Sequence, residues 1–324
     1  MTSLNIVGGG RLGKSVARLA HDSGRYRIGA LLCRSQASAL VARDFVGDGV
    51  ALTTLADLPA ADITLLAVPD GEIAAVAVEL AAARVIAAGS VVCHASGVGE
   101  AALLAPLAAQ GVHCASLHPA FSFADPARAV AGFAGTRCAL EGDAAALPLL
   151  QRLAADIGGV PFVLAPGGKA AYHAALSIAS NYLVTLHDLA SRVAARAGMT
   201  DDIAAAVLGG LMRQTLDNTL ALGPAAALTG PIARGDAGTV AQHRAVLSTQ
   251  DDALYCALGV ATASLAAARL TAAQKQALAA ALGCQPFSAG GVAGVGQWGG
   301  DDGRQLASGG AGGAAARIAA PGRE

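Results

Sequence analysis

The sequence predicts an α/β fold in which a doubly wound parallel sheet is followed by an all-α domain. In the first half, short apolar runs alternate with helix-like segments, the pattern of strands joined by helical crossovers. After Gly168 no strand signal remains, and only helical segments follow. A glycine-rich motif also stands directly after the first apolar run, at the start of the first helix. Together these observations indicate a nucleotide-binding sheet joined to a helical domain.

Eight apolar runs are the expected strands, and the run 62–68 is apolar throughout, as a strand buried on both faces requires. The strands are expected at residues 4–7, 28–33, 50–53, 62–68, 90–94, 114–117, 136–140 and 160–164. The helices between them are expected at residues 12–23, 35–45, 72–87, 100–110 and 144–157. Because most of these strands are separated by helices, we expect the strands to run parallel.

The second half contains only helical segments, separated at glycine positions such as Gly198, Gly223 and Gly230. The helices are expected at residues 169–197, 201–221, 236–249, 251–269 and 271–282. The full length of 324 residues fits about two domains. We therefore predict a nucleotide-binding domain over residues 1–166 and a helical substrate and dimerisation domain over 167–284. A glycine-rich, low-complexity tail over 285–324 is expected to be disordered.

Composition excludes several classes of partner. The 22 basic and 23 acidic residues give a net charge of −1, so no nucleic-acid partner is expected. The six cysteines are widely spaced without a C-x-x-C pair, which predicts reduced thiols and no metal site. No segment is apolar enough to span a membrane, and no signal peptide is visible. We therefore expect a cytoplasmic protein that is not bound to a membrane.

Gly8, Gly10 and Gly13 form a G-x-G-x-x-G motif between the first strand and the first helix. The first glycine permits a tight turn, the second lets the backbone approach a pyrophosphate, and the third allows the helix to pack closely on the strand. With Arg11 and Leu12 between them, these residues are predicted to bind a dinucleotide at the helix N-terminus. The alternative is a Rossmann domain with a degenerate motif that binds no dinucleotide.

The end of the second strand favours NADP(H) as the cofactor. NAD-specific sites place an acidic residue about 20 positions after the motif, where it accepts from the ribose 2′-hydroxyl. Here Arg34 and Ser35 stand in that place, and a guanidinium beside a hydroxyl suits a 2′-phosphate. Because ligands collect at the carboxyl ends of parallel strands, we expect further cofactor contacts there. They are Val68, Pro69, Ser96 and Gly97.

Two clusters are candidates for the substrate side. His118 closes the sixth strand, again at the carboxyl edge. In the segment that follows residue 168, a polar stripe runs along one side of an otherwise apolar helix, which predicts either a cleft wall or a polar network between helices. The stripe comprises Lys169, His173, Ser180 and His187, flanked by Ser177 and Asn181.

The segment 228–236 combines a Gly-Pro turn with Arg234 and an expected N-cap at Asp236. One interpretation is an interhelical loop before a capped helix. The functional alternative is that Arg234 binds an anionic group of the substrate or reaches the cleft of a partner subunit.

The motifs GGGRLG, LLAVPD, HASG, SLHP, AYHAALSIASNYLVTL and LTGPIARGD occur in this order. They resemble the Rossmann-like proteins that carry the C-terminal domain of unknown function 2520. The resemblance covers roughly residues 4–270 and extends to 6-phosphogluconate, β-hydroxyacid and ketopantoate dehydrogenases and to pyrroline-5-carboxylate reductase. It implies NADP-dependent oxidoreductase chemistry, or an N-terminal domain similar to F420-dependent oxidoreductases, and a helical domain that often dimerises.

The chain departs from the β-hydroxyacid dehydrogenases, which place a catalytic lysine four residues before an asparagine. Four residues after Lys169 stands His173, and Asn181 comes twelve residues after it. For this reason we expect Lys169 to contact the substrate rather than to donate the proton.

The sequence thus predicts an NADP(H)-dependent oxidoreductase that transfers hydride between nicotinamide and a small carbonyl or imine substrate. His173 is the first candidate for acid–base catalysis because imidazole titrates near neutral pH, and His118 is the second. Asn181 is expected to hold the carbonyl oxygen, whereas Lys169, Ser177 and Arg234 are expected to bind the substrate. The alternatives are a non-catalytic NADP(H)-binding sensor or scaffold and an F420-dependent oxidoreductase.

Overall fold

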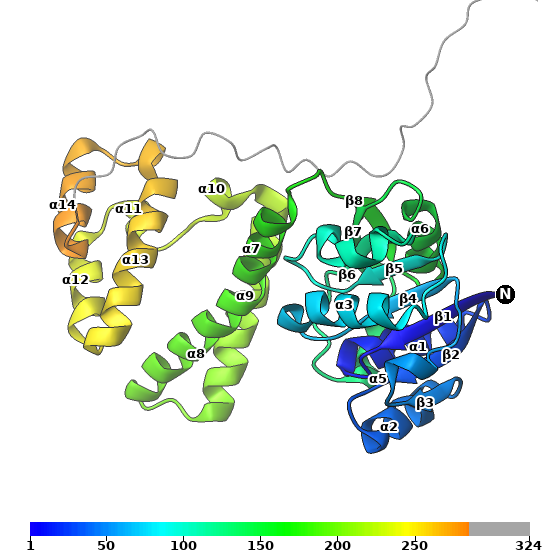
Figure 1. The fold of residues 1–324 in the computed structure, drawn as a ribbon. Coiled ribbons are helices and arrows are strands. Elements are labelled where there is room, and N and C mark those ends of the chain that lie inside the picture. The colour runs from blue at the N-terminus through cyan, green and yellow to red at the C-terminus, as the bar shows by residue number, and fades with distance from the viewer. Residues whose placement is uncertain (285–324) are drawn as a thin grey trace, which may run out of the picture. The chain divides into compact units, whose positions relative to one another are not determined.

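The computed structural model describes residues 1–284, which form two compact units (Figure 1). The first unit comprises Met1–Val184, and the second begins at Thr185. The helix that starts at Lys169 is counted with the first unit, so the compact division lies after the predicted domain boundary at residue 166. The predicted disordered tail, 285–324, lies outside the described residues.

The first unit is built on one eight-stranded sheet in the order β3-β2-β1-β4-β5-β6-β7-β8. Each expected strand is present, with ends that differ by a few residues. The strands are β1 (Thr2–Val7), β2 (Tyr26–Leu32), β3 (Val50–Leu52), β4 (Ile63–Leu66), β5 (Val91–His94), β6 (His113–Pro119), β7 (Arg137–Gly142) and β8 (Val160–Val163). The strand order reverses between β1 and β4, and an open α/β sheet binds ligands beyond the strand ends at such a point.

The expectation of an entirely parallel sheet is wrong at one pairing. Strands β6 and β7 are antiparallel, with Pro119 opposite Cys138, while β8 runs parallel to β7. The end of β6 and the start of β7 therefore lie at the same end of the sheet, and the segment between them does not cross over to the opposite end. Apolar runs buried on both faces have the same composition in either direction, so the sequence pattern carries no signal for this reversal.

Helices cover both faces of the sheet, which explains the apolar character of its central strands. On one face, α1, α2 and α6 bury Val16, Ala42 and Leu150 in the same core cluster as Leu4. On the other face, α3 and α4 pack against Leu66 and its neighbours. The helices are α1 (Arg11–Asp22), α2 (Gln36–Val46), α3 (Ile73–Ala83), α4 (Ala105–Ala108), α5 (Pro126–Gly132) and α6 (Leu147–Asp156).

Two helical segments of the first unit differ from the prediction. The expected helix 100–110 is a 3₁₀ turn, Ala101–Leu104, followed by the single helical turn α4, whose first turn contains Pro106. Helix α5 was not expected. Its signal is local, because Pro126 occupies the first helical position and the Asp125 side chain accepts from the Arg128 amide as an N-cap.

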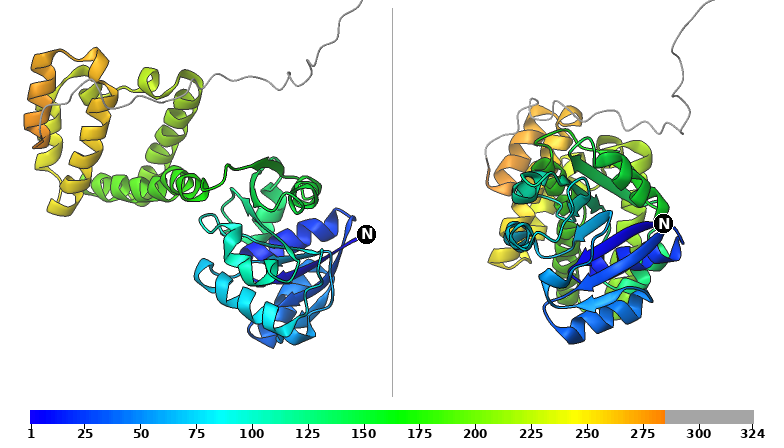
Figure 2. Two further views of the ribbon diagram at one scale, coloured as in Figure 1. Left: turned by 45° about the horizontal axis from the view of Figure 1, so that its top comes forward. Right: turned by 45° about the vertical axis from the view of Figure 1, so that its right-hand side comes forward.

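The second half of the chain is helical throughout, as predicted (Figure 2). The expected helix 169–197 is divided into two at Ser180 (φ −112°, ψ −65°). In the second unit, Val240 of α12, Ala263 of α13 and Leu278 of α14 share one buried cluster. The helices are α7 (Lys169–Ala179), α8 (Asn181–Arg196), α9 (Asp201–Leu222), α10 (Pro224–Ala227), α11 (Pro231–Arg234), α12 (Ala237–Ala245), α13 (Thr249–Leu265) and α14 (Ala272–Leu282).

None of the helices within residues 1–284 combines the length and the apolarity that a membrane crossing requires.

Candidate active site

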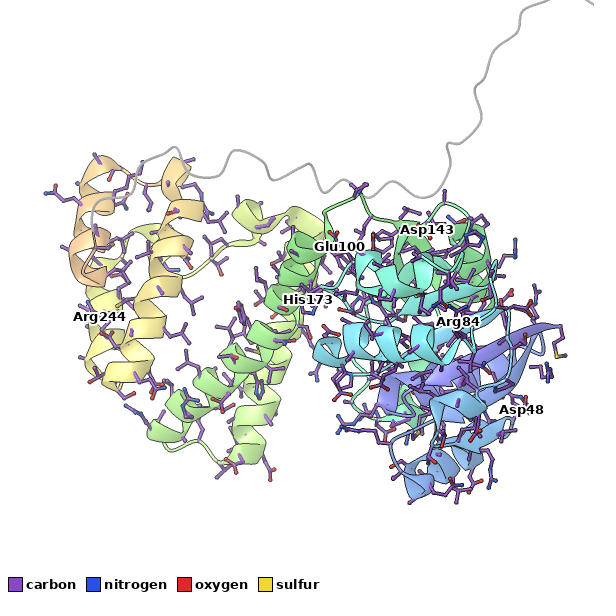
Figure 3. The ribbon with its side chains drawn as sticks, in the orientation of Figure 1. Asp48, Arg84, Glu100, Asp143, His173 and Arg244 are labelled. Atoms are coloured by element: carbon purple, nitrogen blue, oxygen red, sulfur yellow. The ribbon has the colours of Figure 1, made fainter. Side chains whose placement is uncertain are left out.

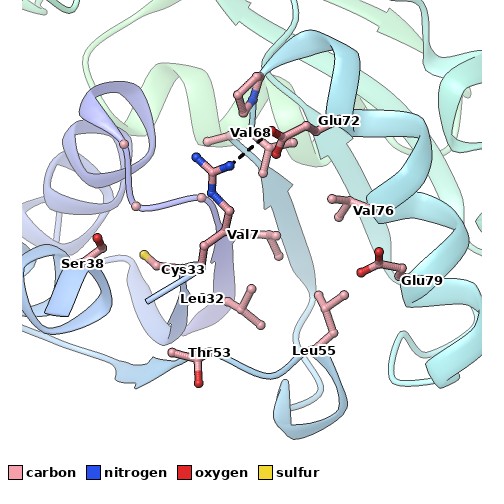
Figure 4. Close-up of a pocket in the computed structure, with 16 residues that line it drawn as sticks. Val7, Leu32, Cys33, Ser38, Thr53, Leu55, Val68, Glu72, Val76 and Glu79 are labelled. Carbon is pink, nitrogen blue, oxygen red and sulfur yellow. Dashed lines mark hydrogen bonds and ion pairs between the residues drawn. The ribbon is translucent and has the colours of Figure 1, made fainter. Parts of the chain in front are cut away.

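A pocket of about 480 Å³ lies at the carboxyl ends of β1, β2, β3 and β4 (Figure 4). It therefore occupies the place where the strand order reverses. Most of its lining residues are apolar or glycine, and its charged lining residues are Arg34, Glu72 and Glu79. The lining residues are Val7, Gly8, Gly9, Gly10, Leu32, Cys33, Arg34, Ser38, Thr53, Leu55, Ala67, Val68, Pro69, Glu72, Val76 and Glu79.

The glycine motif shapes this pocket in the way that a dinucleotide requires. Gly8 has a φ of +106°, and a Cβ there would collide with the Ala67 carbonyl oxygen. A Cβ on Gly13 would collide with the Gly8 carbonyl oxygen, so this glycine lets α1 pack against β1. A Cβ on Gly10, in contrast, would meet no atom within 4 Å. The close packing at two glycines and the open space at the third fit a bound pyrophosphate.

The N-terminus of α1 offers its backbone amides to this space. Gly10 is the N-cap and provides no side chain to accept from the first turn, which begins with Arg11 and Leu12. The first amides of a helix have no partner within the helix, and the helix dipole favours an anion beside them. This end of α1 can therefore hold the phosphates of a nucleotide cofactor.

Arg34 stands at the mouth of the pocket, where β2 ends, and its side chain is 88% exposed. Its Nη1 lies 3.5 Å from Oε1 of Glu72, the ion pair drawn as a dashed line in Figure 4. The neighbouring Ser35 is the N-cap of α2, and its hydroxyl accepts from the Ser38 amide. The guanidinium is thus reachable from solvent, with one acidic neighbour that competes for it.

A second cluster lies in the same unit, where β5 and β6 end. His118 Nδ1 is 3.0 Å from the Tyr172 hydroxyl, and the two rings meet edge to face. The ring of His173, on α7 (Figure 3), has its centroid 6.3 Å from that of His118. Gly97 leaves room for this pair, because a Cβ at Gly97 would collide with the His173 ring and lie 3.0 Å from His118 Nε2. The two histidines, which the sequence predicts as separate candidates, therefore lie in one cluster.

Burial shapes the charge of this cluster. Burial first, and then the ammonium of Lys169 and the ring of His173, lower the pKa of His118 to about 4. Burial raises the pKa of Tyr172 to about 12. Around neutral pH, His118 is consequently an uncharged imidazole beside an un-ionised phenol. Such a pair can donate and accept hydrogen bonds, but it holds no readily released proton.

Lys169 is fully buried at the first position of α7. Its Nζ donates to the Ser96 carbonyl oxygen over 2.6 Å and to the Ser116 hydroxyl over 2.8 Å. Burial lowers the pKa of Lys169 to about 8, and the charges of Glu141, Asp70 and Glu100 oppose that effect. The side chain thus remains protonated at neutral pH while contacting groups of the protein itself.

The remaining predicted residues do not all lie in the nucleotide pocket or in the histidine cluster. Val68 and Pro69 line the nucleotide pocket, whereas Ser96 is buried beneath the second cluster and its hydroxyl accepts from the Val98 and Gly99 amides. Ser177 is half-buried one turn after His173, and Asn181 is exposed at the start of α8. Arg234 is exposed on α11 of the second unit.

Sequence reasoning missed Tyr172 and Glu141 of the cluster and Glu72 of the nucleotide pocket. Tyr172 stands beside a predicted residue, so the motif contained a signal for it. Glu141 and Glu72 gave none, because their partners are distant in the chain and their positions depend on the strand pairing. Within residues 1–284 no group of three potential metal ligands converges, which leaves the prediction of no metal site standing as a prediction.

Two family models match the chain. Residues 1–119 match a Rossmann-like domain, and residues 136–262 match the domain of unknown function DUF2520. The protein joins a Rossmann-like domain to a DUF2520 domain. The resemblance inferred from the motifs is thereby confirmed. In these terms the nucleotide pocket belongs to the Rossmann-like domain, while Tyr172 and His173 belong to the DUF2520 domain.

Solved structures share this combination of folds. Protein TM1727 from Thermotoga maritima is 27% identical, with 82% of this chain and 99% of that chain covered at a TM-score of 0.63. BF3122 from Bacteroides fragilis, described as a candidate NADP oxidoreductase, is 20% identical, with 81% and 98% covered at a TM-score of 0.68. A pyrroline-5-carboxylate reductase from Coxiella burnetii is 16% identical, with 87% and 96% covered at a TM-score of 0.52. No curated protein matches the chain.

Proposed function

We propose that this protein is an NADP(H)-dependent oxidoreductase that interconverts a small carbonyl or imine compound and its reduced form. One observation carries the proposal. A nucleotide pocket built on Gly8, Gly10 and Gly13 lies on the same sheet, at the same edge, as a cluster containing His118 and His173. Dehydrogenases of this fold need both parts, because a bound cofactor must meet a proton-transferring group.

When bound, NADPH would supply the hydride for reduction, and NADP⁺ would accept it in the reverse direction. The chain's own residues bind and orient the cofactor: the α1 N-terminus receives the phosphates, and Val68 and Pro69 form the pocket wall. Arg34 is our candidate for the 2′-phosphate because it is the basic residue at the pocket mouth and is largely exposed.

Within the cluster we assign proton transfer to His173. Hydride addition to a carbonyl carbon leaves an oxygen that must take up a proton, so a positioned acid is needed. His118, whose pKa is held near 4, is neutral around pH 7 and suits hydrogen bonding to the substrate oxygen. Asn181, Ser177 and Arg234 remain our proposed substrate contacts.

The proposal is tested by incubating the full chain with NADPH and a panel of small carbonyl and imine compounds while NADPH absorbance is followed. We expect NADPH oxidation with at least one compound, and deuterium transfer from C4-deuterated NADPH to the product. Tight NADPH binding without turnover across the panel would favour the sensor alternative. Reduction that proceeds only with reduced F420 would favour the alternative of an F420-dependent oxidoreductase.

Cofactor selectivity is expected to depend on the Arg34–Glu72 pair. Arg34→Gln should weaken NADPH binding by about tenfold, because it removes a charged contact to the phosphate, while NADH binding changes little. Glu72→Gln should strengthen NADPH binding by a few-fold, because the 2′-phosphate no longer displaces a carboxylate from Arg34. Calorimetric titration with NADPH and NADH measures both effects.

Glu79→Gln is the matched control for this pair. Glu79 also lines the pocket, but the ion pair with Arg34 is made by Glu72. If Glu79→Gln strengthens NADPH binding as much as Glu72→Gln does, only the net charge of the pocket matters. Equal losses of NADPH and NADH affinity in Arg34→Gln would refute the assignment of the 2′-phosphate to Arg34.

A homodimer through the helical part of the chain remains part of the proposal. Helix α9 spans 22 residues, and in the isolated chain Ile203, Val207 and Leu211 are each more than half exposed. Because these residues are four apart, they lie along one face of the helix. An apolar face of this kind is typical of subunit interfaces. The expected cytoplasmic location and the absence of a nucleic-acid partner stay predictions.

A further inference from the structure

A role in substrate binding does not explain why the side chain of Lys169 is buried. Its side chain is completely buried, and taking an ammonium group out of water is costly unless hydrogen bonds and an opposite charge compensate. Two of its three donors are already used, by the Ser96 carbonyl oxygen at 2.6 Å and the Ser116 hydroxyl at 2.8 Å. A fully buried group that contacts the protein in this way is poorly placed to receive a ligand.

The opposite charge is the carboxylate of Glu141, which the Ser116 hydroxyl links to the ammonium group. Ser116 Oγ lies 3.2 Å from Oε2 of Glu141, so this hydroxyl can accept from Lys169 and donate to the carboxylate. The same carboxylate oxygen accepts from the Ala101 amide at 2.9 Å. Lys169, Ser116 and Glu141 therefore form a continuous hydrogen-bonded network, buried at Lys169 and Ser116 and partly buried at Glu141, that joins α7, β6 and β7.

This network lies directly beneath the two histidines. Ser96, whose carbonyl oxygen is held by Lys169, precedes Gly97, the residue against which both histidine rings pack. On α7, positions three and four after Lys169 are Tyr172 and His173, so all three side chains share one face of the helix. Fixing the start of α7 to the loop after β5 thus fixes the ring of His173 relative to that of His118.

We propose that Lys169 is a positioning residue of the active site and not a substrate ligand: its buried ammonium ties α7 to the ends of β5 and β6 and holds the His118–His173 pair in place. The inference rests on the proposed function, because it assigns a role to a group beneath the reacting pair.

The network also has an electrostatic consequence. The charged and titratable groups that face His118 are Lys169, Tyr172 and His173 of α7 and Asp70 of the 3₁₀ turn Asp70–Glu72. After burial, the charge of Lys169 is the largest influence that lowers the pKa of His118. Lys169 is protonated at neutral pH, since its own pKa is lowered only to about 8. Loss of this charge should therefore raise the pKa of His118.

The test is a nuclear magnetic resonance titration of the full-length protein, in which neither substrate nor turnover is needed. In Lys169→Met we expect the midpoint of His118 to rise by about one pH unit. We also expect the nuclear Overhauser contact between the rings of His118 and His173 to weaken. Lys275→Met, a matched substitution on α14 of the second unit, should leave both signals unchanged.

A second variant covers the case in which Lys169→Met does not fold. Ser116→Ala removes one hydrogen-bond acceptor of the ammonium and its link to Glu141, so the midpoint of Lys169 should fall below its wild-type value. The sequence contains three lysines, Lys14, Lys169 and Lys275, so ¹³C labelling of lysine gives a simple spectrum with two internal controls.

Unchanged midpoints and an unchanged ring contact in the folded variants would overturn the positioning role. A higher KM in Lys169→Met with no change in either signal would restore the role of substrate ligand. A failure of the proposed hydride transfer can be told apart from a failure of the positioning role, because the titrations would still give the expected shifts.

Discussion

Replacing His173 with glutamine is expected to lower the rate of hydride transfer by about 10²- to 10⁴-fold, the usual contribution of a positioned acid or base. Glutamine keeps a polar side chain of similar length but cannot supply a proton. His118 cannot substitute for it, because burial and the ammonium of Lys169 keep the imidazole of His118 neutral at pH 7. NADPH affinity should change by no more than about twofold, since His173 does not line the nucleotide pocket.

The measurement combines single-turnover NADPH oxidation with calorimetric NADPH binding. His243→Gln is a suitable control, because His243 lies on α12 of the second unit and contacts Tyr255 at 2.9 Å in a pair resembling that of His118 and Tyr172. This variant should retain the wild-type rate. A normal rate in His173→Gln together with a large loss in His118→Gln would transfer the acid role to His118.

The second large effect is expected at Gly13. In Gly13→Ala the new Cβ would collide with the Gly8 carbonyl oxygen and come within 3.0 Å of the Ala67 side chain. Backbone atoms cannot move aside cheaply, so α1 must shift away from β1. We expect the free energy of unfolding to fall by about 3 kcal/mol, as in other overpacked sites, and NADPH binding to be lost.

Gly10→Ala separates folding from binding. Its φ of −67° suits alanine, and the added Cβ meets no atom within 4 Å, so the unfolding temperature should stay near that of the wild type. Because Gly10 lines the pocket, the methyl group should still weaken NADPH binding by about tenfold or more. Gly71→Ala, which also adds a methyl in open space but lies outside the pocket lining, is the control.

Thermal unfolding and calorimetric binding test both glycine predictions. Wild-type stability and wild-type NADPH affinity in Gly13→Ala would show that the close packing of α1 on β1 does not shape the site. Full NADPH affinity in Gly10→Ala would place the pyrophosphate elsewhere.

The parts of the site that depend on short stretches of chain were predictable. The G-x-G-x-x-G motif lies within six residues, and its geometry follows from one turn between a strand and a helix. His118 and Val68 were placed at the same sheet edge because parallel strands end on one side. The eight strands were found because alternation of apolar runs with helices is a local pattern.

The parts that depend on pairing between distant segments were not predictable. Glu141 approaches Ser116 because β7 runs antiparallel to β6, and a buried apolar strand does not encode its direction. The expected polar stripe from Lys169 to His187 was drawn on one continuous helix, whereas the structure ends α7 at Ala179. Glu72 meets Arg34 across the pocket from another strand end.

By itself, therefore, the sequence determined the positions of the strands, the helical second half and the nucleotide-binding glycines, because periodicity and local turn geometry depend on neighbouring residues. Only the tertiary structure decided that Lys169 is buried, that His118 and His173 are adjacent, and that one of them is held neutral. Those properties arise from burial and charge contributed by α7, β5, β6 and β7 together, and no single segment contains them.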